Sequence, residues 1–206
     1  PSREENEVRY LSVKYSMPEY LVEKWKAAYG VKTTEKILED FLTERPITVR
    51  CRTHKASLRE IVTSLKSQGV TVEQAPYLPY ALKISDYNHI LTLETFLQGK
   101  ILVQDVSSML VAEAASPKKG DHIIDMCAAP GGKSIHAADK MGDYGNVDAR
   151  DVSQYKADLI KENIHRTGVI NVEARVQDAT VYDPDSEQAA DIVIADVPCS
   201  GYGVIG

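Results

Sequence analysis

A glycine-rich stretch at residues 125–133, Asp-Met-Cys-Ala-Ala-Pro-Gly-Gly-Lys, carries the residue types best suited to holding a ligand. It follows a short apolar run, 122–126, and precedes a helix-like segment, Ser134–Met141. In an open α/β sheet this order places a loop against a ligand at the carboxyl end of a strand. Glycines let the backbone approach the ligand, and the helix N-terminus presents unpaired N–H groups. The spacing fits neither the dinucleotide fingerprint nor the P-loop, so the surroundings must indicate the ligand.

Acidic residues fall where three successive predicted strands end, at Asp125, Asp151 and Asp178. Asp151 lies 19 residues after Gly132, close to the spacing of a carboxylate that accepts hydrogen bonds from ribose hydroxyls. Asp178 is expected near an adenine edge. Each residue alone could be an ordinary acidic residue of a βα loop. Three of them around one glycine-rich loop predict a nucleoside-binding site.

A second stretch with possible chemistry, Asp196-Val-Pro-Cys-Ser-Gly201, ends the apolar run 192–195. Its Cys199 is a candidate nucleophile or leaving-group partner, and a buried structural thiol is the alternative. For Cys51 we favour the buried structural role, and we expect Cys127 to pack near the ligand without reacting. Three scattered cysteines predict neither a disulfide framework nor a metal site, and they favour a reducing, cytoplasmic setting.

The elements that must position these residues alternate between strand and helix after Gly99. A helix over 106–115, with Asp105 as its cap, precedes the alternation. The predicted strands are 122–126, 145–150, 170–176 and 190–196, and the predicted helices are 133–141 and 154–166, with Ser153 as a cap. This pattern is typical of a parallel, doubly wound sheet of the α/β class, of which four strands form about half.

The part of the chain before Gly99 has a different character. Residues 8–44 show helical spacing, interrupted at Met17-Pro18 and Gly30, with Thr33 or Thr34 as a possible cap. Strand-like runs at 47–52, 70–72 and 81–84, and a helix over 58–68 that begins at Ser57, indicate a compact α+β module. We therefore expect three domains, a helical one at 1–45, the α+β module at 46–98 and a Rossmann-like one at 99–206.

Charge is distributed unevenly along the chain, whose formal net charge is −6. Residues 1–120 carry 17 Lys and Arg against 15 Asp and Glu, and residues 121–206 carry 7 against 15. Six basic residues between 45 and 66 face only Glu60: Arg45, Arg50, Arg52, Lys55, Arg59 and Lys66. Such a patch can contact phosphates, and an ordinary solvated surface is the alternative. No apolar run is long enough to span a bilayer, and we expect no signal peptide.

Three stretches together resemble the RNA cytosine-C5 methyltransferases of the Sun (Fmu, RsmB) family. They are Asp125–Lys133, Val103-Gln-Asp-Val-Ser-Ser108 and Asp196-Val-Pro-Cys-Ser-Gly-Tyr-Gly-Val-Ile205. The segment Tyr10–Trp25 is similar to the helical opening of the catalytic region in the ribosomal-RNA branch. The α+β module looks like that family's RNA-recognition-like subdomain.

The resemblance implies a class I methyltransferase sheet that binds S-adenosylmethionine and a cytosine of small-subunit (16S) ribosomal RNA, in a single-stranded or loop region. We expect no metal or membrane partner, and we expect a monomer. The cofactor residues it implies are Cys127, Ala128, Ala129, Pro130, Gly131, Gly132, Lys133, Asp151, Asp178 and Asp196. Asp196 and Cys199 would also be catalytic, Cys199 in product release, and Arg50, Arg52 and Lys55 would contact RNA.

The sequence departs from the family at one important point. In the family, a second cysteine in a Thr-Cys-Ser-type motif adds to C6 of the base, and these 206 residues contain no such motif. The ribosomal-RNA branch also usually carries a helical RNA-binding domain ahead of this region. We therefore expect a fragment of a longer enzyme, with weak cofactor binding at most and no methylation by itself.

Several alternative functions remain open for Cys199 and for the whole chain. Cys199 follows a proline, as the attacking cysteine of DNA cytosine methyltransferases does, so it could itself be the nucleophile. The chain could be a non-enzymatic RNA-binding module, or a transfer-RNA methyltransferase of the same family. Half of a nicotinamide-dependent dehydrogenase is disfavoured by the Ala-Pro-Gly-Gly loop.

Overall fold

The computed structural model describes residues 2–43, 46–142 and 144–199. The chain divides near residue 45 into two compact units, which are described separately. The first contains α1 (Glu7–Lys14) and α2 (Glu19–Phe41), which pack through a small apolar core. Gly30 breaks α2 with a φ of 74°, as the sequence predicts. Thr34, one of the two predicted caps, lies inside α2, where its hydroxyl donates to the Gly30 carbonyl oxygen at 2.9 Å.

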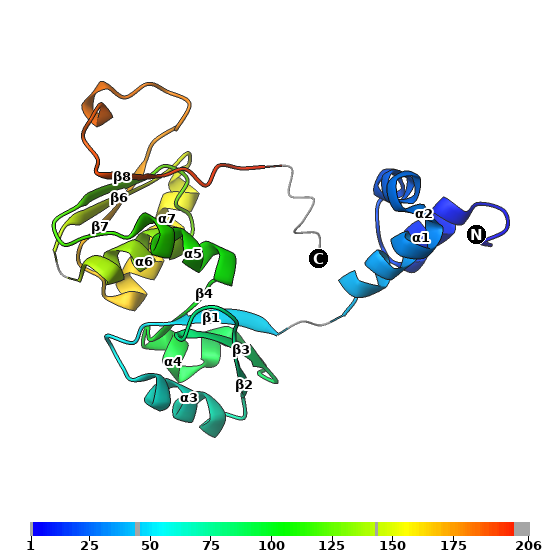
Figure 1. Ribbon diagram of the computed structural model, residues 1–206, viewed down its shortest axis with the longest axis horizontal. Coiled ribbons are helices and arrows are strands. Elements are labelled where there is room, and N and C mark those ends of the chain that lie inside the picture. The colour runs from blue at the N-terminus through cyan, green and yellow to red at the C-terminus, as the bar shows by residue number, and fades with distance from the viewer. Residues whose placement is uncertain (1, 44–45, 143, 200–206) are drawn as a thin grey trace. The chain divides into compact units, whose positions relative to one another are not determined.

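The second unit, residues 46–199, begins with a four-stranded antiparallel sheet in the order β2-β3-β1-β4 (Figure 1). Its elements, in chain order, are β1 (Ile47–Cys51), α3 (Leu58–Ser67), β2 (Thr71–Gln74), β3 (Ala81–Ser85), the short η1 (Ile90–Thr92), α4 (Glu94–Leu97) and β4 (Ile101–Val103). This βαββαβ arrangement is ferredoxin-like. A reciprocal Ser57–Glu60 capping box begins α3, in agreement with the predicted start at Ser57.

The two faces of this first sheet have different neighbours. Val49 and Cys51 of β1 point to the side of α3, where they join an apolar core with Ile61 and Leu65. Ala81 of β3 belongs instead to a cluster with Met109 of α5 (Val106–Ala115). Both faces are therefore covered near the centre of the sheet.

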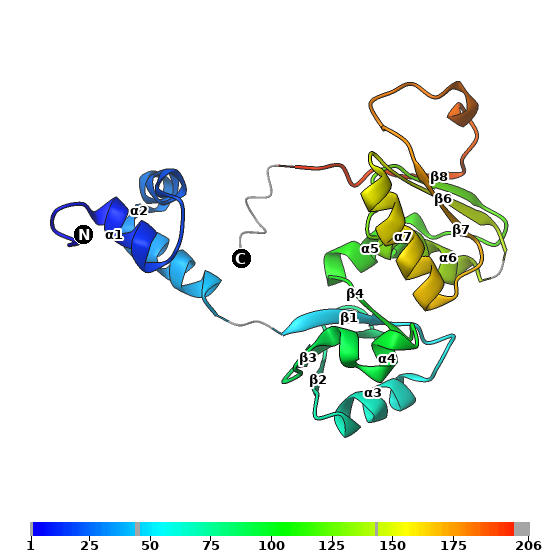
Figure 2. The ribbon, with the colours of Figure 1, turned by 180° about the vertical axis from the view of Figure 1, so that it is seen from behind.

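The rest of the second unit is a parallel sheet in the order β7-β6-β5-β8. Its elements are β5 (His122–Asp125), α6 (Gly132–Met141), β6 (Asn146–Asp151), α7 (Gln154–Thr167), β7 (Val172–Val176), the short η2 (Pro184–Ser186) and β8 (Ile192–Ile194). Helices α6 and α7 cover the same face of this sheet (Figure 2), where alternate strand residues such as Ile123, Val147 and Val172 form the core. The opposite face carries polar groups, including the Asp148–Arg150 ion pair.

The fold confirms the predicted α/β class with its parallel sheet and the α+β module ahead of it. Ser153 also begins α7 as expected, since its hydroxyl accepts from the Lys156 N–H. The predicted domain boundary at 98/99 assigns residues 101–103 to the Rossmann-like domain, whereas β4 pairs with β1 of the first sheet, with Ile101 opposite Cys51. A three-residue apolar run contains no signal for the sheet it joins.

Candidate functional site

The glycine-rich loop leaves the carboxyl end of β5, and the stretch 195–199 leaves the carboxyl end of β8. These two strands are adjacent, although β6 and β7 intervene in the chain. The order of the strands therefore reverses between β5 and β8, and such a switch point opens a crevice at the carboxyl edge of the sheet. The two stretches that the sequence singles out meet there.

The loop is held by its own backbone and by β6. The N–H of Ala128 donates to the Arg150 carbonyl oxygen at 2.8 Å, and the N–H of Gly131 donates to the Ala128 carbonyl oxygen at 2.6 Å. Gly131 has a φ of 99°, and a Cβ at this position would lie 3.3 Å from Ile160 of α7. Only glycine meets both conditions without strain. The turn then leads directly into α6.

A cavity of about 230 Å³ lies beside the loop. The predicted site contributes Cys127, Ala128, Ala129, Pro130, Gly132, Lys133 and Asp196 to its lining. Four lining residues come from the Val103–Ser108 stretch: Val103, Gln104, Asp105 and Ser108. These four were missed as site residues, although the resemblance to the family had already marked their motif. Gly131 is not among the lining residues.

Asp151, at the end of β6, acts on the loop directly. Its Oδ2 accepts from the Ala129 N–H at 3.0 Å, and its Oδ1 accepts from the Val152 N–H at 2.8 Å and pairs with Lys156 at 3.1 Å. Burial opposes ionisation of this carboxyl, but these donors lower its pKa below the usual value. Asp151 is therefore a carboxylate with spare acceptor capacity next to the loop.

Asp178 lies apart from the loop cavity, after β7. It lines a second cavity of about 210 Å³ with Met126, Gln177 and Tyr182. Its Oδ1 accepts from the Thr180 N–H at 2.9 Å and from the Thr180 hydroxyl at 2.7 Å. The glycine-rich loop, Asp151 and Asp178 thus follow β5, β6 and β7 along the carboxyl edge of the sheet. The cavity at Asp178 is separate from the loop cavity.

The three cysteines have different surroundings. Cys51 is buried, and burial raises the pKa of its thiol to about 12, which fits the expected structural role. Cys127 is half-buried, and burial followed by the charge of Asp151 raises its pKa. Cys199 is exposed, three residues beyond Asp196, whose carboxylate pairs with Lys133 at 2.6 Å. The remainder of that motif, Ser200–Ile205, lies outside the described residues.

Asp125, at the end of β5, is buried beneath the loop. Its Oδ2 accepts from the Ser134 hydroxyl of α6 at 2.6 Å, which joins the strand to the helix across the turn. Its Oδ1 is buried without a hydrogen-bond partner among the described residues. Burial raises the pKa of this carboxyl to about 6.

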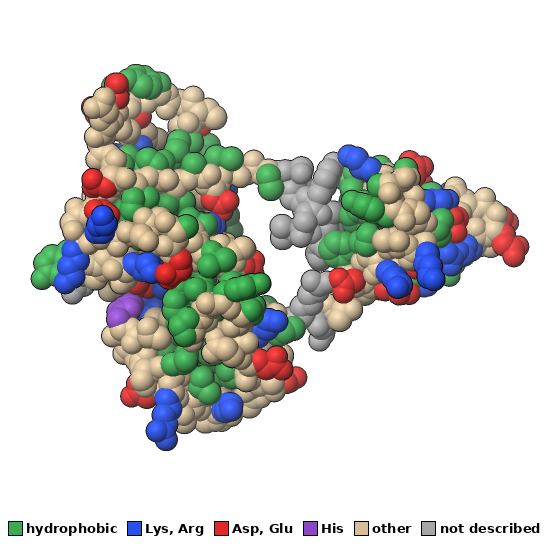
Figure 3. Space-filling view, in the orientation of Figure 1, with side chains coloured by type: hydrophobic (Ala, Val, Ile, Leu, Met, Phe, Trp, Pro, Cys, Tyr) green, Lys and Arg blue, Asp and Glu red, His purple; other side chains and the backbone are tan. Residues whose placement is uncertain are grey.

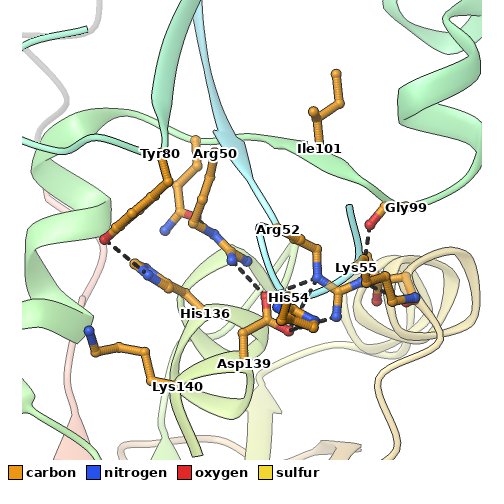
Figure 4. A network of polar contacts seen from close by, with 12 residues as sticks. Arg50, Arg52, His54, Lys55, Tyr80, Gly99, Ile101, His136, Asp139 and Lys140 are labelled. Atoms are coloured by element: carbon orange, nitrogen blue, oxygen red, sulfur yellow. Dashed lines mark hydrogen bonds and ion pairs between the residues drawn. The ribbon is translucent and has the colours of Figure 1, made fainter. Parts of the chain in front are cut away.

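The predicted RNA contacts of Arg50 and Arg52 are wrong. Both side chains are only 2% exposed, and both point toward Asp139 of α6 (Figure 4). Arg50 Nη1 and Arg52 Nη2 each lie 2.6 Å from an oxygen of the Asp139 carboxylate. Arg52 Nη1 also donates to the carbonyl oxygens of Gly99 and Thr167. Burial alone would raise the pKa of Asp139, but the two guanidinium groups lower it.

Lys55 is also engaged, since its ammonium donates to the Thr167 carbonyl oxygen at the end of α7. Arg50, Arg52 and Lys55 therefore join the first sheet to the helices of the second, whereas Arg59 and Lys66 of the same basic segment are exposed. Arg45, the first of its residues, lies outside the described part of the chain. On the face shown in Figure 3, acidic and basic side chains of residues 46–199 are interspersed.

No helix among the described residues is both long and apolar enough to cross a membrane. Within the same ranges, no group of three or more His, Cys, Asp or Glu side chains is arranged to hold a metal ion.

Two family profiles match the chain. The 16S rRNA methyltransferase RsmB/F profile matches residues 112–206, and the ferredoxin-like domain of RsmF/B-like methyltransferases matches residues 17–90. A probable ribosomal RNA small subunit methyltransferase B from Bacillus subtilis is 38% identical over 202 residues, which is 98% of this chain and 45% of that protein. A human 28S rRNA (cytosine(4447)-C(5))-methyltransferase is 31% identical over 95% of this chain and 24% of its own length.

Solved structures share the fold. The crystal structure of PH0851 has a TM-score of 0.83 and 33% identity, covering 96% of this chain and 45% of that one. A methyltransferase homolog protein from Pyrococcus horikoshii has a TM-score of 0.74 and 26% identity, covering 96% and 65%. The chain spans about half or less of the length of the curated relatives described here. With its ferredoxin-like and methyltransferase segments both matched, the chain belongs to the RsmB/F (Sun/Fmu) family, as its three motifs predict.

Proposed function

We propose that this chain holds the methyl donor, S-adenosylmethionine, in an RNA cytosine-C5 methyltransferase that acts on small-subunit ribosomal RNA. The observation that carries the proposal is the cavity at the β5–β8 switch point, which is lined by residues of the loop that Asp151 holds through the Ala129 N–H. A nucleoside ligand suits this edge of the sheet. The names of the relatives, which are rRNA methyltransferases, supply the reaction class.

The residues fit the donor along its length. The loop and Lys133 would hold the amino-acid end, the Asp151 carboxylate would accept from the ribose hydroxyls, and the recess at Asp178 would take the adenine. S-adenosylmethionine supplies an electrophilic methyl group on a sulfonium centre. The role of the protein is to orient that methyl group toward the base and to exclude water from the transfer.

Carbon 5 of cytosine is a weak nucleophile until a thiolate adds to C6. After methyl transfer, a base removes the proton from C5 and the thiolate leaves. We place Cys199 at this second stage, since its thiol is exposed three residues beyond Asp196, which lines the cavity. The target cytosine would be turned out of its stack to reach it. We further propose a monomer acting in the cytoplasm.

Calorimetry with S-adenosylhomocysteine tests the donor site. We expect the chain to bind it. We expect Asp151→Ala to weaken binding at least tenfold, because both the Ala129 N–H of the loop and the ribose lose a hydrogen-bond acceptor. Asp158→Ala is the matched control, since Asp158 is an exposed residue of α7 that pairs with Lys161. Absence of binding by the unaltered chain would favour the non-enzymatic RNA-binding module.

RNA that contains 5-fluorocytosine tests the role of Cys199, because fluorine at C5 blocks release of the attacking thiol. The proposed role predicts no adduct at Cys199 of this chain. A covalent adduct mapped to Cys199 by peptide mass analysis, and lost in Cys199→Ser, would instead make Cys199 the attacking nucleophile. Cys127→Ser serves as the control, since the Cys127 thiol belongs to the cavity lining.

A further inference from the structure

Gln104 lies between β4 and α5 and is almost fully buried, since the residue is only 6% exposed. Its Oε1 accepts from Arg50 Nε at 2.8 Å. Arginine can only donate, so this contact fixes which end of the amide faces Arg50. The amide nitrogen must therefore point the other way.

That nitrogen, Nε2, is buried and has no hydrogen-bond partner among the described residues. Gln104 lines the loop cavity, and its amide carbon would lie 3.7 Å from a Cβ placed on Gly132. The unpartnered donor is thus adjacent to the first residue of α6. An amide donor left without an acceptor in a buried site costs free energy, so its presence at a cavity points to a ligand acceptor.

The surroundings favour a carboxylate as that acceptor. The N-terminus of the ten-residue helix α6 attracts negative charge, and the Lys133 ammonium lies in the same lining. The cavity is also lined by Asp105, and by Asp196 in its ion pair with Lys133, and carboxylates suit an ammonium group. Donors and acceptors of this kind together match the two charged groups of a free amino acid.

We propose that Gln104 recognises the carboxylate of the donor's amino-acid end through Nε2, and that Arg50 is the positioning residue that holds the amide in this orientation. The inference rests on the proposed function. It adds that a residue of the first sheet, Arg50, controls a contact in the donor cavity of the second.

The test compares two probes, S-adenosylhomocysteine and 5′-methylthioadenosine, which lacks the amino-acid end. Gln104→Glu keeps an acceptor for Arg50 but replaces the donor with a negative oxygen. We expect it to weaken S-adenosylhomocysteine binding at least tenfold and to change methylthioadenosine binding less than twofold. Thermal melting checks that the variant is folded.

Equal losses for both probes, or no loss for S-adenosylhomocysteine, would overturn the assignment. If the unaltered chain binds neither probe, the proposed function itself fails, which is a distinguishable result. For Arg50, the readout is the affinity for S-adenosylhomocysteine divided by that for methylthioadenosine, compared between Arg50→Lys and the unaltered chain. A positioning role lowers this ratio toward its value in Gln104→Glu, whereas a purely structural role lowers both affinities together.

Discussion

Asp139 pairs with two arginines that lie 89 and 87 positions earlier in the chain, Arg50 in β1 and Arg52 directly after it. All three side chains are buried, so removing the carboxylate would leave two guanidinium charges without compensation. Breaking such a group costs about 3–5 kcal/mol. We expect Asp139→Ala to lower the free energy of urea unfolding of residues 46–199 by that amount.

The control for this prediction is Asp158→Ala, which breaks an exposed pair and should cost less than about 1 kcal/mol. Because the Asp139 group is buried, the wild-type advantage should change little between low and high salt. An equal cost for the two variants would contradict the interpretation of Asp139 as the centre of a buried ionic group.

Asp125 should give the domain a distinctive pH dependence. Its pKa is raised from 3.8 to about 6 by burial, so the folded state favours the protonated form. Its contribution to stability is therefore complete below about pH 4 and is lost as the pH rises through 6. Asp125→Asn cannot ionise and should lack this loss.

Urea unfolding from pH 4 to 7.5 measures the effect as a difference. Asp125→Asn should gain up to about 3 kcal/mol relative to the wild type across this range, since one pKa unit corresponds to about 1.4 kcal/mol. Asp139 and Asp151 have lowered pKa values, so their contributions to stability increase with pH. These contributions are the same in the wild type and in Asp125→Asn, so they cancel in the difference between the two proteins. Parallel curves for the two proteins would show that Asp125 does not titrate differently in the folded state.

At the scale of elements, the turn between α4 and β4 packs tightly against the end of α7. A Cβ on Gly99 would lie 2.4 Å from the Arg166 carbonyl oxygen and 2.6 Å from the Thr167 Cα, both backbone atoms that cannot move aside. Gly99→Ala should therefore destabilise the domain by about 3 kcal/mol or more, through overpacking added to a positive φ.

Gly69→Ala separates the two causes of that loss. Gly69 also has a positive φ, of 81°, but nothing lies within 4 Å of its added Cβ. Its substitution should cost about 1–2 kcal/mol, from the backbone conformation alone. The melting temperatures of the two variants provide the comparison, and equal values would exclude a special packing role for Gly99.

The sequence was informative where periodicity and local chemistry decide structure. The α5 and α6 helices, the caps at Ser57 and Ser153, and the loop at the end of β5 are all set by residues close together in the chain. The switch point follows from strand order, which right-handed crossovers restrict strongly. The loop residues of the site were therefore within reach of sequence reasoning.

The sequence was uninformative where distant residues compensate one another. A run of basic residues with few acidic neighbours suggests a phosphate surface, and nothing near Arg50 and Arg52 indicates that Asp139 neutralises both. Gln104 was missed for a related reason, since an amide acquires a defined role only when Arg50 fixes its orientation. Both outcomes depend on packing between the two sheets.

At the scale of the second unit, residues 46–199, two sheets are joined through their buried polar groups as well as through Met109. The central face of the ferredoxin-like sheet, which RNA-recognition modules use to stack bases, is occupied here by Arg50 and Ala81, both buried. We therefore expect this sheet to position the donor site and to contribute little to RNA affinity through that face.

Native-state hydrogen exchange can examine the coupling between the sheets. In the wild type, the amides of β1 and β6 should open with the same free energy, because the two sheets unfold as one unit. In Asp139→Ala, the β1 amides should open at lower free energy than those of β6. Uniform loss across both sheets in the variant would argue that other contacts suffice to keep them coupled.

The guanidinium of Arg50 binds Asp139 with one nitrogen and Gln104 with another. Each contact depends on the same side chain remaining in place, so three positions from separate segments share one constraint. Over evolutionary time, a change at position 50 should be tolerated only together with changes at 104 and 139. In an alignment of the family, these three positions should therefore covary as a set, more strongly than any of them does with its neighbours in the chain.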